Sequence, residues 1–149
     1  MMKRSVYIPL IVSLVIILDQ ITKYLIKNYL SPMDSIEIFA FLHIVNVRNT
    51  GAAFGILKNF SSIFFIAISL TAIIFVIYLL KKKVYNAIGL SLLLGGAIGN
   101  LIDRILYAKV VDFIDFSIGN YHWPAFNLAD SSLTIGIGII LLTSVLKKR

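Results

Sequence analysis

The feature that most constrains this chain is a set of four long apolar stretches, each long enough to cross a bilayer as a helix. A transmembrane helix needs about 17–25 largely apolar residues, and the candidates cover approximately residues 6–26, 63–80, 86–106 and 128–146. Of the 149 residues, 59% are hydrophobic and only 14% are charged, whereas soluble domains carry about 25% charged residues. We therefore expect a single integral membrane domain of the α-helical class, residues 1–149.

The basic residues indicate how these spans are oriented. The N-terminus, residues 81–83 and the C-terminus hold eight of the fourteen basic residues and no acidic residue. Because Lys and Arg are enriched in cytoplasmic loops, we expect both termini to be cytoplasmic, with outer loops at approximately 27–62 and 107–127. These clusters explain the net charge of +7 without a nucleic-acid partner. The first span could also be a cleavable signal peptide, but its apolar stretch is followed by "DQITK" at 19–23 instead of a small-residue cleavage site, which favours retention.

The composition also limits the chemistry. The chain has no cysteine, which excludes disulfides, thiol catalysis and thiolate metal sites. Its two histidines, His43 and His122, are too isolated to indicate a metal centre, so we expect no metal and no cofactor. In the first outer loop, "IEIFAFLHIVNV" is β-branched and aromatic, which predicts strands. Asn-Thr-Gly at 49–51 predicts a turn, and Gly55 would permit a close backbone approach.

Polar residues gather at one end of three spans. They lie near the outer end of the first, third and fourth spans and are Asp19, Gln20, Lys23, Asn100, Asp103, Arg104, Asn127, Asp130, Ser131 and Thr134. Charged groups at membrane depth are costly and normally face one another or water. We therefore expect a shared polar cluster near the outer membrane surface.

Several members of this cluster have a structural explanation. Asp19 and Lys23 are spaced as a helical i, i+4 ion pair, and Asn100 could join two helices by a hydrogen bond. Asp103 and Arg104 could pair, or Arg104 could extend its charge to the surface. "GGAIG" at 95–99 favours close helix packing over phosphate binding, and Asp115 could be an ordinary loop residue.

Two aspartates are harder to explain by structure alone. Asp112 lies between apolar pairs in "VVDFI". Asp130 lies on a polar helix face that forms one wall of the expected site, since Asn127, Asp130, Ser131 and Thr134 fall at i, i+3, i+4 and i+7. Two neighbouring carboxyl groups share a proton, so that one can act as a general base on water and the other as a general acid, as in aspartic proteases. The alternatives are a proton- or cation-coupled carrier and a non-catalytic assembly or anchoring protein. A carrier should spread its polar groups through the bilayer, whereas here they gather at one end.

Five segments of the sequence resemble the lipoprotein signal peptidases (signal peptidase II). They are "LDQITK" at 18–23, "NVRNTGAAFG" at 46–55, "GGAIGNLIDR" at 95–104, "VVDFIDF" at 110–116 and "PAFNLADSS" at 124–132. The resemblance implies four spans with a small outer β-sheet segment at residues 34–58. It also implies an aspartic endopeptidase of the bacterial cell membrane, with its site near the extracytoplasmic face, which cuts prolipoproteins just before a cysteine that carries diacylglycerol.

The resemblance further implies roles for individual residues. Asp112 and Asp130 match the catalytic dyad. The positions that line the site and contact substrate or the inhibitor globomycin are Asn49, Asn100, Arg104 and Asn127. Asp19 matches a position that supports structural integrity, and Asp103 matches a strongly retained position that competes for a place in the dyad. The expected partners are diacylglyceryl-prolipoproteins, membrane lipids and globomycin-type inhibitors, and the protein is expected to act as a monomer without a cofactor.

Overall fold

The computed structural model describes residues 3–51, 61–119 and 121–147. Along these ranges the elements are α1 (Arg4–Tyr29), β1 (Ser35–Phe39), β2 (Leu42–Asn49), α2 (Ser62–Lys82), α3 (Ala87–Tyr107), β3 (Val110–Ile118), β4 (Tyr121–His122) and α4 (Leu128–Leu146). Each of the four helices is long and apolar enough to cross a membrane. The four predicted spans are therefore confirmed, and their boundaries differ from the predicted ones by less than a helical turn.

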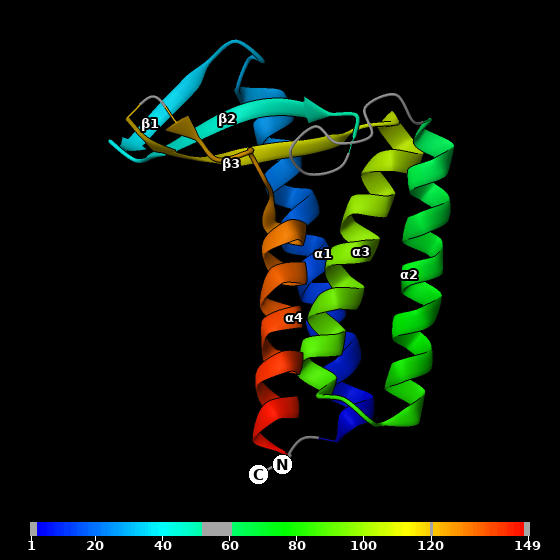
Figure 1. Ribbon diagram of the computed structural model, residues 1–149. Helices are drawn as coiled ribbons and strands as arrows, with labels where there is room; N and C mark the ends of the chain where they lie inside the picture. The colour runs from blue at the N-terminus through cyan, green and yellow to red at the C-terminus, as the bar shows by residue number, and fades with distance from the viewer. Residues whose placement is uncertain (1–2, 52–60, 120, 148–149) are drawn as a thin grey trace.

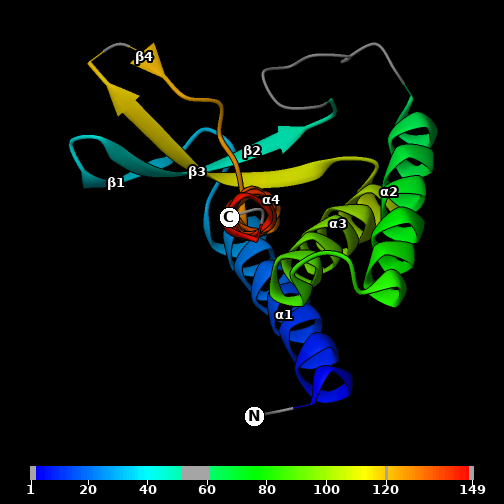
Figure 2. The ribbon, with the colours of Figure 1, turned by 60° about the horizontal axis from the view of Figure 1, so that its bottom comes forward.

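Helix α3 is the centre of the helical bundle. It packs against α1, α2 and α4 and lies between α2 and the other two helices (Figure 2). Most of the buried helical residues belong to α3, whereas α1, α2 and α4 expose many large apolar side chains. A helix bundle in a membrane presents such an apolar surface to the lipid, because lipid tails form no hydrogen bonds with polar groups.

The glycines of α3 allow its neighbours to approach closely. A Cβ atom added at Gly95 would lie 2.8 Å from the Val15 Cβ atom of α1, and one added at Gly96 would lie 2.5 Å from the Ala129 carbonyl oxygen of α4. Both distances are too short for a side chain, so small residues set the spacing of the helices. The packing role expected for "GGAIG" is confirmed.

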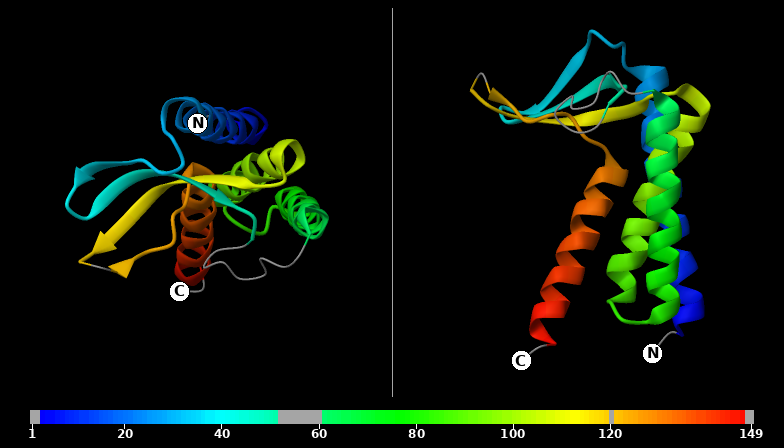
Figure 3. Two further views of the ribbon diagram at one scale, coloured as in Figure 1. Left: turned by 90° about the horizontal axis from the view of Figure 1, so that it is seen from above. Right: turned by 45° about the vertical axis from the view of Figure 1, so that its right-hand side comes forward.

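An antiparallel sheet lies across one end of the bundle, opposite the two chain termini (Figure 1). Its strand order is β1-β2-β3-β4, and β3 runs from the end of α3 across the start of α4 (Figure 3). Strands β1 and β2 confirm the strands predicted in the first outer loop. Residues 52–58 of the predicted sheet segment, including Gly55, fall outside the described residues.

The sheet also draws on the second outer loop, which was not expected. Strand β3 pairs with β2 and supplies a central strand, although "VVDFIDF" contains two aspartates, a residue type depleted in strands. The position expected to be an ordinary loop residue, Asp115, is thus a buried member of β3, where its Oδ2 atom lies 2.8 Å from Nδ1 of His122. Tertiary pairing here overrides local preference.

An irregularity in β2 attaches the sheet to the bundle. The register between β2 and β3 shifts between Ile44 and Val47, a bulge that bends a strand and redirects its side chains. Within it, the buried Asn46 donates from Nδ2 to the Leu30 carbonyl oxygen at the end of α1, at 2.6 Å. Immediately after the bulge, Val47 lies opposite Asp112 of β3.

Candidate active site

Asp112 is held at the start of β3 by amide donors. The backbone N–H of Val111 donates to Oδ2 of Asp103 at 3.0 Å, which fixes the beginning of the strand to the end of α3. Asp112 itself is only 2% exposed. Its Oδ2 atom accepts from Nδ2 of Asn49 at 2.9 Å, and its Oδ1 atom accepts from Nδ2 of Asn127 at 2.7 Å. Asn49 is oriented in turn, because its Oδ1 atom accepts from the Gly51 backbone N–H at 2.9 Å, as in an Asx turn.

Asp130 is fixed by the start of α4. Asn127 is the N-cap residue, and its side-chain oxygen accepts from the Asp130 backbone N–H at 2.9 Å. In return, Oδ2 of Asp130 accepts from the Asn127 backbone N–H at 3.2 Å, which completes a capping box. The other oxygen, Oδ1, accepts from Nδ2 of Asn100 at 2.7 Å. The carboxyl group is thereby immobilised at a helix N-terminus, where the helix dipole favours negative charge.

Asn127 connects the two aspartates. Its side chain donates to Asp112 and accepts from the Asp130 backbone, and its Nδ2 atom also lies 3.2 Å from Oδ1 of Asn100. Asn127 is completely buried and lies behind the two carboxyl groups. A displacement of α4 relative to β3 would therefore break the bond from Asn127 to Asp112 and separate the two carboxyl groups.

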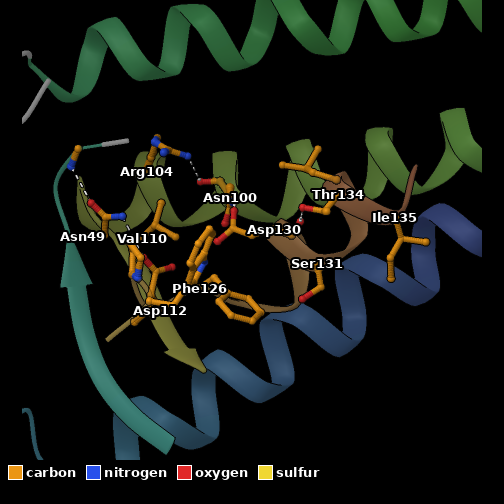
Figure 4. Close-up of a pocket in the computed structure, with 15 residues that line it drawn as sticks. Asn49, Asn100, Arg104, Val110, Asp112, Phe126, Asp130, Ser131, Thr134 and Ile135 are labelled. Carbon is orange, nitrogen blue, oxygen red and sulfur yellow. Dashed lines mark hydrogen bonds between the residues drawn. The ribbon is translucent and has the colours of Figure 1, made fainter. Parts of the chain in front are cut away.

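Asp112 and Asp130 line the same cavity, of about 590 Å³. Figure 4 shows Asn49 next to Asp112 and Asn100 next to Asp130. The residues that line the cavity are Asn49, Gly51, Asn100, Arg104, Val110, Asp112, Trp123, Pro124, Ala125, Phe126, Asp130, Ser131, Leu133, Thr134 and Ile135. Three of the four residues expected on the polar face of α4, Asp130, Ser131 and Thr134, line the cavity. Asn127 was expected to line it too, but it is completely buried and is not among the described lining residues.

Arg104 does not pair with Asp103. Its Nη1 atom donates to the Asn100 carbonyl oxygen at 3.4 Å, and its guanidinium group lies over the Phe65 ring of α2, 5.4 Å from the centroid. Of the two alternatives considered for Arg104, pairing with Asp103 is therefore wrong, because successive residues of a helix point in different directions. Arg104 instead brings a positive charge to the cavity wall.

Asp19 and Asp103 belong to a buried cluster behind the cavity. Nζ of Lys23 lies 2.9 Å from Oδ2 of Asp19 and 3.3 Å from Oδ2 of Asp103, and all three side chains are completely buried. The expected pair of Asp19 and Lys23 is thus confirmed. Neither Asp19 nor Asp103 is among the described residues that line the cavity.

The environment of Asp112 changes its acidity. Its pKa is raised from the ordinary 3.8 to about 7, first by burial and then by the nearby charge of Asp130. Hydrogen bonds from Asn49 and Asn127 and the charge of Lys23 lower the pKa but only partly offset these effects. At neutral pH the side chain therefore takes up and releases a proton readily, as a general acid or base must.

This raised pKa predicts a pH dependence of stability. Between about pH 4 and pH 7 the folded state holds a proton on Asp112 that the unfolded state has released, so the contribution of Asp112 to the free energy of unfolding falls as pH rises. We expect Asp112→Asn to remove that contribution. Thermal unfolding in detergent at pH 4, 5.5 and 7 should show a melting temperature that falls more steeply for the native protein than for the variant. Equal slopes would contradict the raised pKa.

Sequence reasoning missed two parts of the site. The segment Trp123–Phe126 forms one wall of the cavity, and the Phe126 backbone pairs with Ile114 of β3. In the sequence this wall includes "PAF" at 124–126, just before Asn127. We used these residues only for the resemblance to the family and assigned them no role in the site. Lys23 was interpreted solely as an ion-pair partner of Asp19, although its ammonium group also lies 2.9 Å from Oδ1 of Asn100.

Comparisons with known proteins agree with this arrangement. Residues 11–146 match the family model described as signal peptidase (SPase) II. A lipoprotein signal peptidase of Thermodesulfovibrio yellowstonii is 47% identical over 135 residues, which cover 91% of each chain. One from Francisella tularensis subsp. novicida is 43% identical over 144 residues, which cover 91% of this chain and 89% of the relative.

Solved structures are similar as well. One bacterial membrane enzyme, determined by the in meso method at 2.3 Å resolution, superposes with a TM-score of 0.85 at 43% identity and covers 95% of this chain and 88% of its own. A second, determined in the same way at 1.9 Å, gives a TM-score of 0.83 at 42% identity and covers 96% and 94%. With a family match over most of its length and relatives this similar, the chain belongs to the signal peptidase II family of membrane peptidases.

Proposed function

We propose that this protein removes signal peptides from diacylglyceryl-modified prolipoproteins, cutting just before the lipidated cysteine with Asp112 and Asp130 as its catalytic dyad. The observation that carries the proposal is that these two carboxyl groups, tied to one buried asparagine, line a single cavity at one end of the four spans. Membership of the signal peptidase II family supports the peptidase activity. The comparisons give no support to a carrier.

The dyad can activate water without a cofactor. Asp112, with a pKa of about 7, carries the shared proton at neutral pH, and Asp130 acts as the carboxylate. Asp130 removes a proton from a water molecule as the water oxygen attacks the scissile carbonyl carbon. Asp112 gives its proton to the carbonyl oxygen at the same time, which avoids an unneutralised oxyanion. The product of this step is a tetrahedral diol.

The same two groups complete the reaction. Asp130 returns its proton to the amide nitrogen as the carbon–nitrogen bond breaks, and one diol hydroxyl returns a proton to Asp112 as the carboxylic acid forms. The amide donors of Asn49, Asn100 and Asn127 hold both carboxyl groups throughout. Arg104, whose positive charge lies on the cavity wall, is positioned to bind a backbone carbonyl of the substrate.

The position of the cavity suits a substrate anchored in lipid. Asp130 lies in the first turn of α4 and Asp112 at the start of β3, which follows α3, and the cavity extends along α4 as far as Ile135. A lipidated precursor can therefore present its peptide bond at the membrane surface while its apolar parts stay in the bilayer. In this proposal the protein acts as one 149-residue domain and as a monomer, among membrane lipids, and globomycin-type inhibitors occupy the same cavity.

The substrate requirement is directly testable. The purified enzyme in lipid vesicles should cut a prolipoprotein that carries diacylglycerol on its cysteine, with the new N-terminus at that cysteine. An unmodified precursor should be cut far more slowly, because it lacks the lipid that holds the bond at the cavity. Mass spectrometry of the products identifies the cut site. Equal cleavage of both precursors, or cleavage elsewhere, would contradict the proposed specificity.

The proposed orientation can be tested independently. We propose that both termini are cytoplasmic and that the sheet and dyad lie at the extracytoplasmic face, because the basic clusters accompany the termini. A green fluorescent protein fused after Arg149 should fluoresce, and alkaline phosphatase fused there should be inactive in a bacterial host. An active phosphatase fusion would show that the C-terminus is extracytoplasmic, which contradicts the proposed orientation.

A further inference from the structure

We propose that Lys23 is a positioning residue for the dyad, in that its ammonium group sets the orientation of the Asn100 amide that binds Asp130. This inference rests on the proposed catalytic role of Asp112 and Asp130. Lys23 itself does not line the cavity among the described residues. It would act only through Asn100.

The contacts of Lys23 use its full donor capacity. An ammonium group has three N–H donors, and Nζ lies 2.9 Å from Oδ2 of Asp19, 3.3 Å from Oδ2 of Asp103 and 2.9 Å from Oδ1 of Asn100. The side chain is 0% exposed, so no water competes for these positions. One of the three donors is thus directed at an uncharged amide next to the dyad.

This contact determines which way the Asn100 amide faces. Oδ1 of Asn100 accepts from Lys23 at 2.9 Å and from Asn127 at 3.2 Å, so Nδ2 is left to donate to Oδ1 of Asp130 at 2.7 Å. A rotation of the amide by 180° would place its NH₂ group against the ammonium and its oxygen against the carboxylate. Both contacts would be repulsive, and therefore the charge of Lys23 selects the orientation that binds Asp130.

A second path leads to Asp112. The Nδ2 atom of Asn127 lies between Oδ1 of Asn100 and Oδ1 of Asp112, at 3.2 Å and 2.7 Å. A reversed Asn100 amide would place its own NH₂ group against Nδ2 of Asn127, and the repulsion between the two donors would weaken the bond from Asn127 to Asp112. Lys23 therefore influences both carboxyl groups through one amide.

Gln20 binds the same two aspartates as Lys23 but forms no hydrogen bond with Asn100 in the described part of the chain. Asp19 also accepts from the Ala129 backbone N–H at 3.0 Å and from Gln20 at 3.1 Å. Asp103 accepts from Gln20 at 3.3 Å as well. Gln20 thus joins the same two aspartates from the same helix, and no hydrogen bond joins it to Asn100 within the described ranges. It provides a matched control for Lys23.

The test compares Lys23→Met with Gln20→Met, each also combined with Asn100→Ala. Cleavage of a diacylglyceryl prolipopeptide is measured per folded enzyme in vesicles, with kcat and KM determined separately. We expect Lys23→Met to lower kcat by about 10- to 100-fold, as is typical when a hydrogen-bond partner that orients a metal ligand is removed, with KM unchanged. Gln20→Met should lower the melting temperature but leave kcat close to the native value.

The double variants provide the decisive comparison. Because Lys23 acts through Asn100, Lys23→Met should cause no further loss of kcat once Asn100→Ala is present. An equal loss in both backgrounds, or a native kcat for Lys23→Met, would overturn the proposal. If Lys23→Met does not accumulate in the membrane, Asp19→Asn/Lys23→Met removes both charges of the pair and takes its place. If Asp112→Asn and Asp130→Asn are inactive while Lys23→Met is fully active, the positioning role of Lys23 is rejected but the dyad is not.

Discussion

Asp130→Asn is expected to abolish prolipoprotein cleavage while leaving the protein folded in the membrane. The amide cannot accept a proton from water, and a missing general base costs about 10²- to 10⁴-fold in rate. The start of α4 should survive, because the N-cap bond from the Asp130 backbone N–H to Asn127 does not involve the substituted group. Cleavage of a diacylglyceryl prolipopeptide, measured with equal amounts of membrane-embedded enzyme, gives the loss directly.

A control from the same turn of α4 separates chemistry from local damage. Ser132 is buried, its hydroxyl donates only to the Leu128 carbonyl oxygen of its own helix, and it does not line the cavity in the described part of the chain. Ser132→Ala should therefore cleave at close to the native rate. If Asp130→Asn also did so, Asp130 would have no place in the dyad.

Asp103→Asn is expected to reduce the amount of folded protein instead of the chemistry. Oδ2 of Asp103 accepts from the Val111 backbone N–H and faces Nζ of Lys23, in a completely buried position. Breaking a buried ion pair by removing one charge costs about 3–5 kcal/mol, a large share of the 5–15 kcal/mol by which proteins are typically stable. Membrane abundance and the melting temperature in detergent should both fall strongly.

The activity of the surviving Asp103→Asn protein distinguishes its role from that of Asp112. Per folded molecule it should cleave much faster than Asp130→Asn, because Asp103 points away from the cavity toward Lys23 and the start of β3. A variant that accumulates and melts normally but is inactive would instead place Asp103 in the reaction. Asp103 would then take the place in the dyad that we assign to Asp112 or Asp130.

The helical part of the fold follows from the sequence because lipid imposes a simple requirement. A span must be long and apolar, so hydropathy alone locates four helices, and polar groups within spans must face one another. The latter rule correctly brought Asp19, Asn100 and Asp130 together, although they come from three helices. Helical spacing predicted a shared wall for Asn127, Asp130, Ser131 and Thr134, and all but Asn127 line the cavity.

The sheet and the hydrogen-bond network could not be predicted in the same way. Strand β3 contains Asp112 and Asp115, and it forms because β2 pairs with it along its length and the Phe126 backbone pairs with Ile114. The bond from Lys23 to Asn100 joins residues 77 positions apart, whereas sequence spacing revealed only the local pair of Lys23 with Asp19. Such contacts depend on how α1 docks against α3, which no local pattern encodes.

The claim that Asp112 and Asp130 work as one unit is tested most directly by the kcat of Asp112→Asn/Asp130→Asn beside those of the two single variants. Groups that act together in one step are strongly non-additive, because either loss already disables the step. We expect both single variants to be inactive and the double variant to have the same residual rate, with all three proteins folded in the membrane. A single variant that cleaves at close to the native rate, or a double variant whose loss is the product of two partial losses, would contradict the dyad.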